Sequence, residues 1–153
     1  MDTILIEIRS VLTVDLILKN FPELKSKKKF IQKGLDIVKV KTPKIYRYLS
    51  KENAIINLRK YKIIIEHDPG IKQKEIRKIV NYWIKRAKIK RMFLSFVDLL
   101  IIPFTAILTP IPGPNFIFYA VFLLFYFHVS GYLSLRKIRV EDLNIEFDEK
   151  KLC

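Results

Sequence analysis

The feature that most constrains this chain is a long uncharged block. From Met92 to Leu135 there is no lysine or arginine, and Asp98 is the one acidic residue. A single helix needs roughly 20 apolar residues to cross the hydrocarbon core of a bilayer, so the block is long enough for about two crossings. A soluble chain of 153 residues would have difficulty covering such a block. The block therefore predicts a membrane-inserted segment.

The centre of the block predicts a turn between two helices. Three prolines and a glycine within a few positions cannot continue a helix. We expect helices over 93–108 and 116–135, with the turn at 109–115. At 1.5 Å per residue the first would extend only about 24 Å, so the hairpin is either tilted, seated in a thinned bilayer, or dipping in without emerging. The residues predicted to build the turn are Pro110, Pro112, Gly113, Pro114 and Asn115, the last as a helix cap.

The distribution of charge predicts an orientation. Nearly all of the net charge of +14 precedes the block, basic residues flank both of its ends, and the turn has none. The positive-inside rule then places both termini in the cytoplasm, with the hairpin in the cell inner membrane. The basic flanks are expected to contact anionic lipid headgroups. These residues are Lys85, Arg86, Lys88, Lys90, Arg91, Arg136, Lys137 and Arg139.

The first 91 residues predict a small, basic, helical cytoplasmic domain. Apolar residues recur at helical spacing over 3–19 and, less regularly, over 24–40. Thr42-Pro43 indicates the start of a third helix, which is expected to end near residue 65. The stretch 61–65 fits a short strand equally well.

The segment 69–91 predicts an amphipathic basic helix beside the membrane. No breaker separates this helix from the first apolar helix, so we expect one long helix or two with a slight bend. Residues 136–153 are expected to form a short polar tail. The predicted fold class is all-α, with a helical domain followed by a transmembrane helical hairpin.

Two ionisable residues lie inside the apolar block, where they are costly and suggest a function. Asp98 lies 14 residues before Pro112 and His128 lies 16 after it, which gives them nearly equal depth in an antiparallel hairpin. One hypothesis is a proton-responsive pair in direct contact. The alternative is that Asp98 extends to the interface and His128 bonds a backbone carbonyl or faces headgroups. Pro103 is expected to bend the first helix, because it removes one amide donor.

The segment 86–138 carries a family resemblance. A basic helix leads into the proline-containing run 98–105, the turn 109–115 follows, and Tyr126-Phe127-His128 comes later. This order resembles the mitochondrial K+/H+ exchange-related family and its bacterial relatives, which have a Pro-x-Pro-x-x-Asn-type turn and an aromatic segment ending near Tyr-x-His. The resemblance implies support of potassium and proton homeostasis, alone or as a subunit. Leu124 and Ser130 stand where the family pattern has arginine.

A second interpretation is a membrane-anchored interaction or scaffold module without transport. The expected partners are an anionic bilayer and either a second copy or another membrane protein. Nucleic acid is not expected, since basic charge comes without zinc ligands or a recognition-helix signature. Neither an enzyme, a metal site nor a cofactor is expected: the chain has one cysteine, Cys153, and no phosphate-binding motif. His67 is expected in a surface loop.

Overall fold

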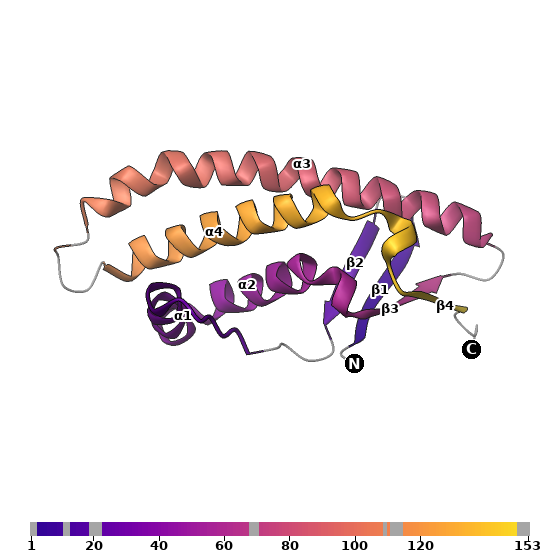
Figure 1. Ribbon diagram of the computed structural model, residues 1–153, viewed down its shortest axis with the longest axis horizontal. Helices are drawn as coiled ribbons and strands as arrows, with labels where there is room; N and C mark the ends of the chain where they lie inside the picture. The colour runs from indigo at the N-terminus through magenta and orange to yellow at the C-terminus, as the bar shows by residue number, and fades with distance from the viewer. Residues whose placement is uncertain are drawn as a thin grey trace.

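The computed structural model describes residues 3–10, 13–18, 23–67, 71–108, 110 and 115–149. Figure 1 shows a long helical hairpin with two shorter helices along one side and a small sheet near the chain ends. The strands are β1 (Thr3–Ser10), β2 (Thr13–Leu18), β3 (Lys62–His67) and β4 (Ile145–Glu149). The helices are α1 (Lys29–Lys41), α2 (Pro43–Ile56), α3 (Gln73–Ala106) and α4 (Asn115–Lys137), with 3-10 turns at Leu58–Lys60 and Val140–Asp142.

The prediction that the chain is mainly helical is confirmed. Helix α3 runs unbroken from the basic segment into the apolar one, as expected, and α4 matches the predicted second apolar helix. Helix α2 begins at Pro43 with Thr42 as its N-cap residue. Pro103 lies inside α3 without ending it, and Figure 1 shows α3 as one curved helix. A local bend caused by Pro103 stays a prediction.

The helix expected over 3–19 is wrong, and the all-α class omits a sheet. Strands β1 and β2 occupy this segment and pair antiparallel. The sheet order is β2-β1-β3-β4, with β1–β3 and β3–β4 parallel. The segment is rich in isoleucine, threonine and valine, whose branched side chains favour strands. Its apolar residues fit a helical stripe as well as an alternating one, and pairing with β3 favours the strand.

The C-terminal segment and the stretch near residue 65 also join this sheet. Of the two interpretations of 61–65, the strand is the one present, in β3. Residues 136–153 are not simply a polar tail, because β4 pairs with β3 and places Phe147 against the core. His67 ends β3, is buried, and makes an edge contact with the Phe147 ring, so the expected surface loop is wrong.

Helix α4 forms the middle layer of the helical part. It packs against α3 on one side and against α2 and α1 on the other. One core joins the sheet to the basic end of the hairpin and includes Ile63, Ile76 and Leu135. A second core joins α1 and α2 to the apical half of α4 and includes Val38, Leu49 and Leu123. The hairpin therefore shares both cores with the rest of the chain.

Among the described residues, one helix, α4, is long and apolar enough to cross a membrane. The predicted turn is described only in part, since Pro112, Gly113 and Pro114 lie outside the described residues. Pro110 is an exposed turn residue. Asn115 is the first residue of α4, but its side-chain Oδ1 is buried without a hydrogen-bond partner in the described chain. The predicted capping bond is therefore not formed.

Candidate functional site

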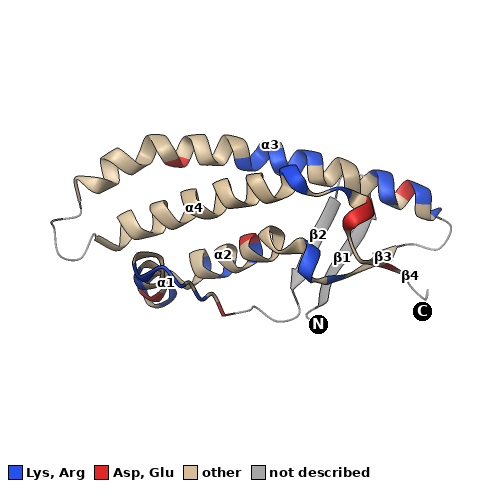
Figure 2. Ribbon diagram, in the orientation of Figure 1, with Lys and Arg blue, Asp and Glu red and all other residues tan. Residues whose placement is uncertain are grey.

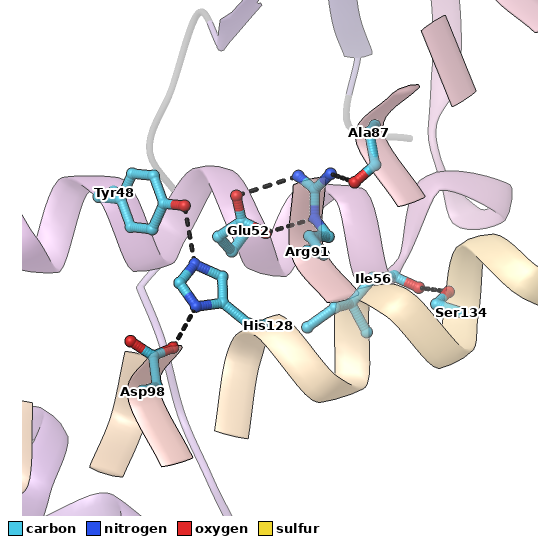
Figure 3. A network of polar contacts seen from close by, with 8 residues as sticks. All are labelled: Tyr48, Glu52, Ile56, Ala87, Arg91, Asp98, His128 and Ser134. Carbon is cyan, nitrogen blue, oxygen red and sulfur yellow. Dashed lines mark hydrogen bonds and ion pairs between the residues drawn. The ribbon is translucent and has the colours of Figure 1, made fainter. Parts of the chain in front are cut away.

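Five polar side chains meet where α2, α3 and α4 come together. We call this group the polar junction (Figure 3). Helix spacing explains how three segments far apart in sequence supply it. Residues four apart on α2, and seven apart on α3, lie on one face of their helix. The polar junction consists of Tyr48 and Glu52 from α2, Arg91 and Asp98 from α3, and His128 from α4.

Asp98 and His128 are in direct contact, as hypothesised from their matching depth. His128 Nδ1 lies 2.5 Å from Asp98 Oδ2, and both residues are buried, at 3% and 8% exposure. The other ring nitrogen, Nε2, lies 2.8 Å from the hydroxyl of Tyr48. The histidine is therefore held at both nitrogens, by a carboxylate from one helix and a phenol from another.

One assignment of hydrogens satisfies this chain of bonds with a neutral histidine. The Tyr48 hydroxyl donates to Nε2, and Nδ1–H donates to the Asp98 carboxylate. Burial raises the pKa of the Tyr48 phenol, and the neighbouring Glu52 carboxylate raises it further. Tyr48 therefore stays protonated at neutral pH and remains available as the donor.

Glu52 and Arg91 form the second half of the polar junction. Arg91 Nε and one terminal nitrogen donate to the two Glu52 oxygens at 2.7 and 3.0 Å, and the other terminal nitrogen donates to the Ala87 carbonyl at 2.9 Å. The Arg91 side chain is 7% exposed. The predicted contact of Arg91 with lipid headgroups is therefore wrong. A planar guanidinium suits this two-pronged bond, whereas lysine would not.

The apolar half of α3 has an inverted polarity: it buries polar side chains and exposes apolar ones, which is the reverse of a helix on the surface of a water-soluble protein. Between residues 92 and 106 its buried residues are Asp98 and Thr105, and the Thr105 hydroxyl donates to the Ile102 carbonyl. Large apolar side chains occupy the opposite face, which we call the outer face, and Phe104 is 72% exposed. The outer face consists of Ile89, Phe93, Phe96, Leu100, Phe104 and Ile107.

The basic residues gather on the other half of α3 (Figure 2). Lys85, Arg86 and Lys90 are exposed and Lys88 is half-buried, so they remain available for headgroups. Arg136 and Lys137 are exposed in the last turn of α4, and Figure 2 shows that this end of α4 lies beside the middle of α3. Arg139 is exposed and precedes the 3-10 turn, where its backbone N–H donates to Asp142. Seven of the eight predicted headgroup residues thus lie at the surface or partly at it.

Comparisons with protein-family models, with curated proteins and with solved structures found no match. Sequence reasoning did not select Tyr48 or Glu52. Both lie on a helix whose sequence is crowded with charge, so a polar residue there resembles an ordinary exposed one. Within the described parts of the chain, no group of three or more His, Cys, Asp or Glu side chains is placed to hold a metal.

Proposed function

We propose that this chain is a membrane protein whose α3–α4 hairpin is inserted in lipid. The observation that carries the proposal is the inverted polarity of α3, which buries Asp98 and exposes Phe93, Phe96 and Phe104. Leaving a large apolar side chain in water forgoes about 1.5–3 kcal/mol of burial. In the hydrocarbon of a bilayer, exposing the same face carries no such penalty. Ionisable groups at that depth turn towards the protein interior, as Asp98 does.

The positions of the basic residues support a location at the cell inner membrane, with both termini on the cytoplasmic side. Figure 2 shows the basic residues on the half of α3 away from the turn and at the end of α4, and Lys85, Arg86 and Arg136 are among those that are exposed. The sequence prediction of two bilayer crossings depends on α4, whose length and hydropathy are sufficient, and on the shorter apolar half of α3.

Within that membrane, we propose a role in potassium and proton homeostasis, as a subunit of an oligomer or beside another membrane protein. Support comes from the resemblance to the K+/H+ exchange-related family and from the Asp98–His128–Tyr48 chain of bonds, which links two helices through a group that can gain a proton. A partner is needed because two apolar helices do not enclose a pathway.

A second candidate is a membrane-anchored interaction module. The observation that favours it is burial: His128 is only 3% exposed and is bonded at both ring nitrogens. Such a residue can serve solely to fix the packing of α4 between α2 and α3. The hairpin would then act as an anchor for the sheet and for α1.

Ion flux in proteoliposomes separates the two candidates. Vesicles containing purified protein, with any copurified partner, would be loaded with a pH-sensitive dye and given a potassium gradient. Potassium-dependent proton movement that falls with Asp98→Asn and persists with Ser95→Ala, at a half-buried position of α3, would support homeostasis. Equal proton leakage from vesicles with and without protein would favour the membrane-anchored interaction module. Release of the protein from native membranes by alkaline carbonate would contradict both candidates.

A further inference from the structure

Helix α1 lies against the half of α4 that is far from its basic end. The contact is close because Gly34 has no side chain: a Cβ at that position would lie 3.2 Å from Cδ1 of Tyr119 and 3.4 Å from Cδ1 of Leu123. The ring of Phe30 adds a contact with Tyr119, with centroids 5.4 Å apart. Leu123 precedes Arg136 by 13 residues, or about 20 Å along the helix.

The surface of α1 is mostly charged, although Phe30 and Val40 are exposed as well. Its exposed residues include Lys29, Lys33, Lys39 and Lys41, beside Asp36. If α4 crossed the bilayer with Arg136 at the headgroups, these lysines would lie about 20 Å deep in a hydrocarbon core roughly 30 Å thick. Charged side chains at that depth are strongly disfavoured. The side of the molecule on which α1 packs against α4 therefore faces water.

The opposite side of the helical part has the chemistry of a membrane-binding surface. At about 100° per residue, Ile89, Phe96 and Ile107 fall within about 30° of the direction opposite Asp98. Nearer the start of α3, the exposed residues Lys78, Lys85 and Arg86 fall within about 60° of the same direction. An apolar face that passes into a cationic one matches the acyl chains and anionic headgroups of a single leaflet.

We infer that the hairpin lies obliquely within the cytoplasmic leaflet of an anionic bilayer and does not cross it. The outer face of α3 contacts acyl chains, Lys78, Lys85 and Arg86 contact the headgroups, and α1 and α2 stay in water. This inference rests on the proposed membrane insertion, fixes its depth and replaces the two crossings expected from the sequence, so that any ion pathway would belong to the membrane partner. It also keeps α1 packed on α4, whereas two crossings would require α1 to leave.

The test uses single cysteines in the full chain, with Cys153→Ser as background. Phe96→Cys and Leu100→Cys place an environment-sensitive fluorophore on the outer face, and Lys33→Cys places it on α1. With vesicles of phosphatidylcholine and phosphatidylglycerol, we expect a blue shift and quenching by doxyl-labelled lipid at 96 and 100, and neither at 33. The pair at 96 and 100 guards against one variant that fails to fold. Absence of any shift at both would overturn the inference and the proposed insertion together.

A second measurement distinguishes one leaflet from two crossings. Pro110 lies at the tip of the hairpin, so a cysteine is placed there with Pro110→Cys. Spheroplasts that contain this variant are then treated with a membrane-impermeant maleimide. We expect no labelling at 110 until detergent is added, and labelling of Lys33→Cys only in inverted vesicles. Labelling at 110 from outside would overturn the leaflet inference and leave the insertion intact.

The headgroup contact has its own matched control. Lys85→Glu with Arg86→Glu should weaken binding to anionic vesicles at least tenfold, whereas Lys33→Glu with Lys39→Glu changes net charge equally and should weaken it far less. Equal losses for the two pairs would show that net charge alone drives binding and would overturn the assigned orientation. If the protein elutes from a size-exclusion column as a dimer and does not bind vesicles, the outer face would be assigned to a second copy of this chain. That result would also overturn the inference.

Discussion

Gly131 of α4 lies directly against the side chain of Arg91 on α3. A Cβ built on Gly131 would be 2.9 Å from Cδ and 3.0 Å from Nε of Arg91, and 3.5 Å from a Glu52 oxygen. Real Cβ atoms do not approach other atoms that closely. The glycine therefore makes room for the stem of an arginine whose head is bonded to Glu52 and to the Ala87 carbonyl.

Gly131→Ala should destabilise the fold although alanine is the better helix former. The helix propensity gained is at most about 1 kcal/mol. The clash moves Arg91 and strains its bonds, so we expect a net loss of about 1–3 kcal/mol. Thermal unfolding in a mild detergent measures the change. Ser130→Ala, on the same turn of α4, is the control and should stay near the wild-type value. A more stable Gly131→Ala protein would contradict the packing described.

Removing one partner of the buried ion pair should lower the free energy of unfolding more than replacing both partners does. Glu52→Leu leaves Arg91 buried without its partner, for which we expect a loss of about 3–5 kcal/mol. The double variant Glu52→Leu with Arg91→Met replaces both charges by apolar groups and should recover most of that loss. Equilibrium unfolding of the two variants and the wild type tests this. The surface pair Arg59 and Asp142 offers the control, since Arg59→Met should change stability by about 1 kcal/mol or less.

Tyr48 should make stability fall at alkaline pH. The pKa of its phenol is raised in the folded state from an ordinary value of 10.0, mainly by burial. The folded protein thus holds this proton more tightly than the unfolded chain does. That contribution is complete below about pH 10 and is lost as the pH rises above it.

Tyr48→Phe is the matching variant. Near pH 7 it should lose about 0.5–1.5 kcal/mol, because the hydroxyl no longer bonds His128. Its stability should then decline less steeply than that of the wild type above pH 10, so the two curves converge. Tyr82→Phe, at an exposed position on α3, controls for the loss of any one tyrosine. Parallel curves for Tyr48→Phe and the wild type would contradict the raised pKa.

The hairpin could be predicted from sequence because its signals are local. The uncharged block and the prolines near 112 fix where α3 ends and α4 begins, and equal depth brings Asp98 to His128. The sheet could not be predicted in the same way. Strand β4 comes from a segment with as many acids as bases, and its alternating Ile145 and Phe147 have meaning only once β3 lies beside them.

The polar junction was predicted only in part for a similar reason. Arg91 stands at the end of a basic run and resembles its neighbours, so charge alone assigned it to headgroups. Its position seven residues from Asp98 puts both on the inward face of α3, and that spacing is the signal that distinguishes it from Lys90. Glu52 and Tyr48 carry no comparable signal, because α2 meets α4 through tertiary packing.

The contact of Asp98 with His128 should appear as an energetic coupling. Asp98→Asn and His128→Gln keep the size of each side chain roughly constant and change the bond between them. Each variant leaves a buried polar partner poorly satisfied, for which we expect a loss of about 1–3 kcal/mol. Because both variants remove the same contact, the double variant should lose less than the sum, by about 0.5–3 kcal/mol.

Equilibrium unfolding of the four proteins of this cycle, in one detergent and at one pH, gives the coupling directly. Ser95→Ala with Leu133→Ala is the matched control, since it pairs exposed or partly exposed positions on the same two helices and should be additive. The cycle should also weaken when Tyr48→Phe is added to all four proteins, because a histidine released at Nε2 is held less firmly against the carboxylate. Additive losses for Asp98 and His128 would mean that the 2.5 Å contact does not stabilise the fold. If the coupling energy between Asp98 and His128 is unchanged after Tyr48→Phe, the Tyr48 phenol does not support their contact and has no part in a proton-linked role.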